Sequence, residues 1–198
     1  MEWEEGPVLR RAIHIASPVL LAFYLLPDDL EMGVPKLLVA AILWLVTLVI
    51  ELLRLLGRLE ILGIREYERG QISAYFWGGT GLFLGFALFP PAFVVVAMFG
   101  MAWIDPLSAL TRRRGGYPWV PLVASLALAA VGLSLLTPFR FPAVLALALI
   151  AAVVAIAAEY PRLRWIDDDF TMFMAPLIAL TAVGALLQNL EFAVPAGA

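Results

Sequence analysis

Long apolar runs recur along the whole chain, and they restrict how it can fold more than any other feature. Each run holds roughly 15 to 22 residues and is bounded by proline, glycine or charged residues. A helix that crosses the ~30 Å apolar core of a bilayer needs about 20 residues. The runs therefore predict an all-α integral membrane bundle of about seven transmembrane helices. Their expected ranges are 12–26, 35–56, 72–89, 91–110, 118–136, 139–158 and 170–190.

Composition excludes several other classes of protein. Of the 198 residues, 63% are hydrophobic and 15% are charged, whereas soluble domains have about 25% charged residues. A water-soluble domain is thereby excluded, and residues 1–198 are expected to form a single transmembrane domain. The chain has no cysteine, which excludes disulfides, thiolate catalysis and Cys-ligated metals. The net charge of −3 and the short basic clusters give no indication of a nucleic-acid-binding surface.

The basic residues predict the orientation, because lysine and arginine are retained on the cytoplasmic side of a membrane. With the N-terminus inside, only Lys36 and Arg140 fall on the outer side, and the C-terminus is external. The acidic stretch 1–5 is unlike the basic start of a signal peptide, so we expect the first run to be a retained helix. The other basic residues, all on the predicted cytoplasmic side, are Arg10, Arg11, Arg54, Arg58, Arg65, Arg69, Arg112, Arg113, Arg114, Arg162 and Arg164.

Ionisable residues at the ends of the apolar runs indicate a functional site, because each costs roughly 2.5 to 3.5 kcal/mol to insert into a membrane. His14, Asp105, the aspartates 167–169 and the arginines 112–114 all fall on the predicted cytoplasmic side. Carboxylates bind Mg²⁺, and guanidinium groups match phosphate oxygens. The pattern therefore predicts a metal and phosphate site. The candidate magnesium ligands are Asp105, Asp167 and Asp168, and the candidate phosphate-binding residues are Arg11, Arg112, Arg113 and Arg114.

Each of these residues also has a structural interpretation. Asp105, followed by Pro106, has the pattern of a helix N-cap, and Asp169 before the last run has it too. His14 is explained equally by hydrogen-bonded packing, and the arginines 112–114 by anchoring of the topology. Against a purely structural role for Asp105, Ser108 and Arg112 follow it at spacings that place all three on one helical face.

Two further segments carry weaker patterns. The stretch 51–71 interleaves charged residues with leucines and reads as a helix end that continues into an amphipathic interfacial segment with mostly solvated charges, in which Glu68 and Arg69 are candidate site residues. Gly81 and Gly85 form a GxxxG pair inside an apolar run, which predicts close helix packing.

Four short motifs and their order along the chain resemble the polyprenol kinase family, which includes dolichol kinases, phytol kinases and CTP-dependent diacylglycerol kinases. The resemblance covers most of the chain. The motifs are Arg10-Arg11-Ala12-Ile13-His14, Arg65-Glu66-Tyr67-Glu68-Arg69-Gly70, Ile104-Asp105-Pro106-Leu107-Ser108-Ala109-Leu110 followed by Arg112-Arg113-Arg114-Gly115-Gly116, and Asp167-Asp168-Asp169-Phe170-Thr171.

The resemblance implies an enzyme that transfers the γ-phosphoryl group of a nucleotide, usually CTP, to a lipid alcohol at the cytoplasmic membrane face. It implies Mg²⁺ as cofactor, Asp105, His14 and Asp168 as catalytic residues, and Asp169 and Thr171 as further candidates. The family's Lys-Ser/Thr-x-Glu-Gly element is replaced here by residues 117–121, so arginines must supply the cations. A phosphatidate cytidylyltransferase, an inactive relative and a small transporter stay as alternatives.

Overall fold

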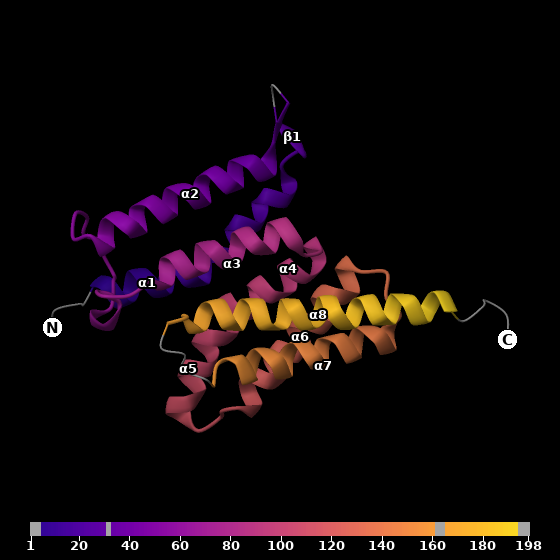
Figure 1. The fold of residues 1–198 in the computed structure, drawn as a ribbon. Coiled ribbons are helices and arrows are strands. Elements are labelled where there is room, and N and C mark those ends of the chain that lie inside the picture. Colours follow the sequence, from indigo (N-terminus) through magenta and orange to yellow (C-terminus); the bar gives the residue numbers. More distant parts are fainter. Residues whose placement is uncertain (1–4, 31–32, 161–164, 194–198) are drawn as a thin grey trace.

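The computed structural model describes residues 5–30, 33–160 and 165–193, which form helices and one short hairpin (Figure 1). In these labels η1 and η3 are 3₁₀ helices and η4 is a π-helical turn. The elements are α1 Glu5–Ala16, η1 Ser17–Leu25, β1 Asp29–Leu30, β2 Val34–Pro35, α2 Lys36–Leu55, η3 Glu66–Glu68, α3 Ala74–Leu88, α4 Pro91–Phe99, η4 Gly100–Ile104, α5 Asp105–Arg114, α6 Trp119–Leu136, α7 Phe141–Ala158 and α8 Asp168–Ala193.

Five helices are long and apolar enough to cross a membrane, which confirms the all-α class and indicates a multi-pass membrane protein. Two other predicted runs form shorter apolar helices, Arg11–Leu25 and Ala74–Leu88, so the count of seven spans stays a prediction. The five long helices are Lys36–Leu55, Pro91–Arg114, Trp119–Leu136, Phe141–Ala158 and Asp168–Asn189.

Successive helices run back and forth along the bundle, and the connections alternate between its two ends (Figure 1). The start of α1, the segment 56–73, the turn between α5 and α6 and the start of α8 lie at one end, on the left of Figure 1. The β1–β2 hairpin and the turns between α3 and α4 and between α6 and α7 lie toward the other end. The described segments that the charge pattern assigns to the cytoplasm therefore share one end of the molecule.

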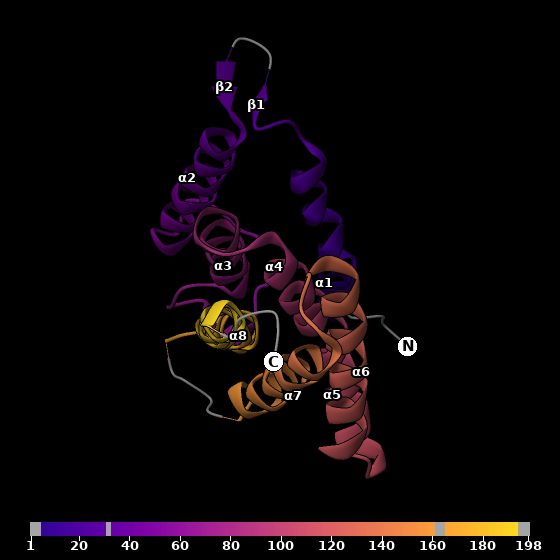
Figure 2. The same cartoon turned by 90° about the vertical axis from the view of Figure 1, so that its right-hand side faces the viewer.

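The core lies where α4, α6, α7 and α8 pack together (Figure 2). Its most buried side chains include Val94, Leu133, Leu147 and Leu177, each with no exposed surface. By contrast, α2 packs against α3 at the edge of the bundle. Only 6% of the residues in its most apolar 18-residue stretch are buried. Outward-facing apolar side chains of this kind suit a helix whose surroundings are lipid.

The glycine pair of α3 confirms the predicted close packing. A Cβ atom added at Gly81 would lie 3.2 Å from a ring carbon of Phe170, and one added at Gly85 would lie 3.0 Å from a ring carbon of Phe173. Both aromatic rings belong to α8. The absent side chains thus allow α3 to approach α8 closely, and this contact forms one wall of the site described next.

Single cysteines test the predicted topology directly, because the chain itself has none. Arg114→Cys, at the end of α5, should react with a membrane-impermeant maleimide only after the membrane is permeabilised. Asp29→Cys, in the hairpin at the opposite end, should react in intact cells. The unsubstituted protein is the control and should take up no label. Labelling of both variants from the same side would contradict the topology.

Candidate functional site

His14 lies between two carboxylates that come from distant parts of the chain. Its Nε2 atom is 3.8 Å from Oδ2 of Asp105, and its Nδ1 atom is 3.6 Å from Oδ2 of Asp169. The three side chains are 13%, 29% and 18% exposed, respectively. One ligand atom from each residue fits within 4.8 Å of the other two. The fold therefore gathers α1, α5 and α8 around one imidazole.

The helix that carries Asp105 is irregular at this point, and the irregularity holds His14 in place. Residues 100–104 form a π-helical turn, a distortion often found at functional sites, and Pro106 has no N–H to donate to the preceding turn. The carbonyl of Met101 accepts a hydrogen bond from His14 Nε2 at 3.0 Å. Because a carbonyl can only accept, Nε2 carries the hydrogen. His14 Nδ1, beside Asp169, is then the nitrogen that can accept a proton.

The N-cap interpretation of Asp105 is wrong. The residue before it, Ile104, has helical backbone angles, and no side chain caps the start of α5. The helical segment instead runs without a break from Pro91 to Arg114. Asp105 is therefore free of a capping role and points its carboxylate toward His14.

The three aspartates around the start of α8 have different surroundings. Oδ1 of Asp167 accepts a hydrogen bond from the backbone N–H of Asp169 at 3.1 Å, so Asp167 closes the turn that begins the helix. Asp168 is exposed, while Asp169 faces His14. The structure thus brings Asp169 to Asp105, where the sequence pattern predicts Asp167 and Asp168. Thr171 donates to the backbone carbonyls of Ala158 and Asp168 at 3.3 and 2.9 Å and ties α8 to the end of α7.

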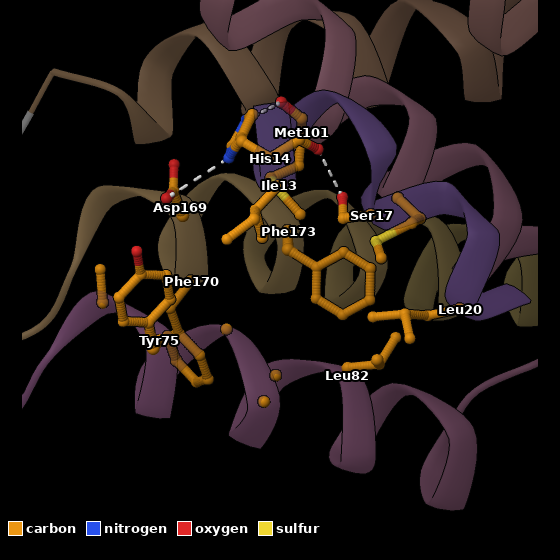
Figure 3. Close-up of a pocket in the computed structure, with 15 residues that line it drawn as sticks. Ile13, His14, Ser17, Leu20, Tyr75, Leu82, Met101, Asp169, Phe170 and Phe173 are labelled. Atoms are coloured by element: carbon orange, nitrogen blue, oxygen red, sulfur yellow. Dashed lines mark hydrogen bonds and ion pairs between the residues drawn. The ribbon is translucent and has the colours of Figure 1, made fainter. Parts of the chain in front are cut away.

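An apolar pocket of about 240 Å³ opens beside this cluster, between α1, η1, α3, α4, η4 and α8 (Figure 3). His14, Ser17, Tyr75 and Asp169 are the polar side chains that line it. The rest of the lining is apolar or glycine, including Ile13, Leu20, Gly78, Leu82, Met98 and Phe173. The pocket therefore combines an ionisable end with a long apolar wall.

The four arginines predicted to bind phosphate differ in their contacts. Arg112 forms an ion pair with Glu159 at 2.9 Å, and its guanidinium lies over the ring of Tyr117, 4.4 Å from the centroid. Arg112 keeps 41% of its side chain exposed, whereas Glu159 is 3% exposed. Burial raises the pKa of Glu159 above its usual range, although Arg112 opposes the shift. Arg11, Arg113 and Arg114 are exposed.

Glu159 and Tyr117, which contact Arg112, are not among the residues predicted from the sequence. Glu159 directly follows the apolar run 139–158, which contains no carboxylate. Its place at the end of that run is the signal that the sequence offers. Ser108, which sequence spacing places on the face of Asp105, is fully buried, and its hydroxyl lies beside Glu159. Ser108 therefore belongs to the surroundings of Arg112 and Glu159 rather than to the pocket lining.

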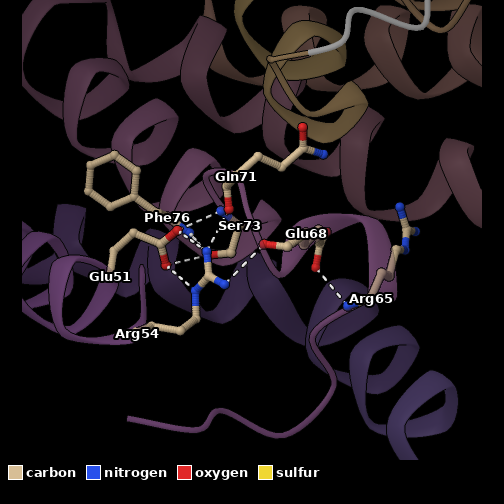
Figure 4. A network of polar contacts seen from close by, with 7 residues as sticks. All are labelled: Glu51, Arg54, Arg65, Glu68, Gln71, Ser73 and Phe76. Atoms are coloured by element: carbon tan, nitrogen blue, oxygen red, sulfur yellow. Dashed lines mark hydrogen bonds and ion pairs between the residues drawn. The ribbon is translucent and has the colours of Figure 1, made fainter. Parts of the chain in front are cut away.

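Most charged side chains of 51–71 are exposed, as predicted, but Glu51, Arg54 and Glu68 are buried (Figure 4). Arg54 donates two hydrogen bonds to Glu51, at 3.0 and 2.6 Å, and others to the carbonyls of Glu68 and Gln71. Glu51 also accepts from the backbone N–H and the hydroxyl of Ser73 at 2.7 and 2.8 Å. These three groups and Ser73 form a buried cluster that joins the end of α2 to the loop before α3.

The two candidate residues of this segment have different surroundings. The carboxylate of Glu68 accepts a hydrogen bond from the backbone N–H of Arg65 at 2.9 Å, so Glu68 has a structural role in the loop. Arg69 is exposed. The buried cluster also holds the loop that leads into α3. Ser73, which donates to Glu51, caps that helix by accepting from the backbone N–H of Phe76 at 3.3 Å.

The carboxylates of Asp105 and Asp169 fit Mg²⁺. This ion prefers hard oxygen ligands and commonly takes one or two carboxylates, with water and substrate phosphates completing its shell. The two carboxylates converge on the same imidazole, and both are partly exposed, so further ligands have access. His14 is a poorer match for Mg²⁺ than for softer metals, and its Nε2 is already occupied by the Met101 carbonyl.

Comparison of the chain with protein-family models, with curated proteins and with solved structures finds no match. His14, Asp105 and Asp169, which come from three of the four short motifs, meet in space. What the site can do chemically depends on these three residues, the neighbouring Arg112 and the apolar pocket.

Proposed function

We propose that this protein is a lipid-alcohol kinase that transfers the γ-phosphoryl group of a nucleotide, with CTP as donor, to a long-chain isoprenoid or related alcohol at the cytoplasmic membrane face. The observation that carries the proposal is the position of His14 and Asp169 in the lining of an apolar pocket, with Asp105 beside them. A lipid alcohol has the matching form, with one polar end and an apolar tail. The short motifs support the choice of reaction.

The residues of the site account for the movement of the proton. The alcohol oxygen forms a bond to the γ-phosphorus, the bond from that phosphorus to the β–γ bridging oxygen breaks, and the nucleoside diphosphate leaves. The hydroxyl proton passes to His14 Nδ1, because Nε2 already donates to the Met101 carbonyl. The nearby carboxylates of Asp105 and Asp169 stabilise the imidazolium that results.

Charge on the phosphates requires cations near the site. Asp105 and Asp169 would hold Mg²⁺, which neutralises charge on the transferred phosphoryl group when bound. Arg112 is the arginine best prepared to assist, because Glu159 and Tyr117 hold it while part of its guanidinium stays exposed. Arg113 and Arg114, which are exposed on the same helix, add positive charge at this end of the bundle.

Incubation of the purified protein with CTP labelled at the α- or the γ-phosphate, Mg²⁺ and a mixture of prenols, diacylglycerol and phosphatidate tests the proposal. Label from the γ-phosphate should appear on a lipid alcohol. Transfer of label from the nucleotide's α-phosphate to phosphatidate would replace the kinase by a cytidylyltransferase. The absence of any labelled lipid with CTP, ATP or GTP would overturn the proposal and favour a transporter or an inactive relative.

A further inference from the structure

Tyr75 has a buried hydroxyl that nothing in the described part of the chain satisfies. The residue lies in the first turn of α3 and lines the pocket beside His14 and Asp169. Its Oη atom is inaccessible to solvent and has no hydrogen-bond partner among the described residues. Figure 3 shows this hydroxyl pointing toward the end of the pocket where Asp169 lies. A buried polar atom without a partner costs stability, so it is expected to meet a partner when the pocket is filled.

Gly78 leaves open space one helical turn beyond Tyr75. Residues three apart on a helix share a face, and both residues line the pocket. A Cβ atom added at Gly78 would meet no other atom within 4 Å, whereas one added at Gly81 would lie 3.2 Å from Phe170. The missing side chain of Gly78 therefore enlarges the pocket, while that of Gly81 serves packing against α8.

We infer that Tyr75 recognises the hydroxyl group of an uncharged lipid alcohol and that Gly78 makes room for the first part of its tail. The identity of the ligand as an alcohol rests on the proposed function. Tyr75 is a binding residue in addition to His14, Asp105 and Asp169, and none of the four short motifs includes it.

The hydrogen-bonding groups of the pocket select a neutral hydroxyl. A tyrosine hydroxyl both donates and accepts, and His14 Nδ1 accepts when the imidazole is neutral with its hydrogen on Nε2. An alcohol can accept from Tyr75 while it donates to His14. A lipid carboxylate has no hydrogen to donate, and it would enter a site that already holds the carboxylates of Asp105 and Asp169. Fatty acids are therefore excluded by like charge, and alcohols are accepted.

Binding of three probes to the purified protein in nanodiscs, without nucleotide, tests the inference. The probes are farnesol, the hydrocarbon farnesene, which lacks the hydroxyl, and farnesoic acid. The unsubstituted protein should bind farnesol at least about tenfold more tightly than either of the others, a difference of about 1.4 kcal/mol. Equal affinity for farnesol and farnesene, or for farnesol and farnesoic acid, would overturn the inference.

Two variants separate recognition of the hydroxyl from accommodation of the tail. Tyr75→Phe keeps the ring and should weaken farnesol binding about tenfold while leaving farnesene binding unchanged. Gly78→Leu fills the open space and should weaken both. Tyr160→Phe removes a hydroxyl from a tyrosine that is 77% exposed and is the matched control. Unchanged farnesol binding by Tyr75→Phe, with an unchanged unfolding temperature, would overturn the role of Tyr75.

The binding assay also separates this inference from the proposed reaction. A protein that binds farnesol selectively through Tyr75 but transfers no phosphoryl group would contradict the kinase proposal and support the recognition site. A protein that phosphorylates farnesol equally well with tyrosine or phenylalanine at position 75, with unchanged binding, would support the kinase and overturn the recognition site.

Discussion

Asp105→Asn should lower the rate of phosphoryl transfer at least about a hundredfold, equivalent to roughly 2.7 kcal/mol in the activation free energy. Asparagine has the size of aspartate but lacks the charge that faces His14 at 3.8 Å and that would hold Mg²⁺ beside Asp169. The side chain caps no helix, so the unfolding temperature should change little. Initial rates with labelled CTP and a prenol, and thermal unfolding in detergent, measure the two effects.

Asp28→Asn is the matched control for this variant. Asp28 lies near the hairpin at the other end of the bundle and pairs with Lys36 at 2.9 Å. Removal of its charge should leave the rate of transfer unchanged. A protein with Asp105→Asn that unfolds early but retains full turnover would show that Asp105 has a structural role only.

Arg54→Met should destabilise the protein by about 3 to 5 kcal/mol, because it leaves a buried carboxylate without its main partner. Arg54 and Glu51 are each only 5% exposed at the side chain. The variant also removes the hydrogen bonds that Arg54 donates to the carbonyls of Glu68 and Gln71. The loop before α3 would lose its anchor, and Tyr75 would lose its position. Thermal or denaturant unfolding in detergent measures the loss.

A double substitution and an exposed arginine provide the controls. Glu51→Gln together with Arg54→Met removes both charges and should cost less than the sum of the two single substitutions. Arg58→Met replaces an exposed arginine of the same segment and should change stability by less than about 1 kcal/mol. Equal effects of Arg54→Met and Arg58→Met would contradict a structural role for the buried pair.

Local features of the sequence were sufficient for the class of fold. An apolar run about 20 residues long must satisfy its own backbone hydrogen bonds in a membrane, and a helix does this without partners. The predicted runs 72–89 and 91–110 begin within a few residues of α3 and α4, because Ser73 caps α3 and Pro91 begins α4. The glycine pair Gly81 and Gly85 identified a close contact, although it did not show that α8 supplies the opposite surface.

The sequence therefore determined by itself an all-helical membrane protein with His14 and Asp105 as candidate site residues, because hydrophobic length and helical spacing are local properties. Only the tertiary structure decided that Asp169 rather than Asp168 meets His14, that Glu159 holds Arg112 and that Arg54 is buried. The pocket of Tyr75 and Gly78 was decided in the same way. These contacts join residues far apart in the chain, and the rotation and approach of one helix against another depend on the packing of all of them together.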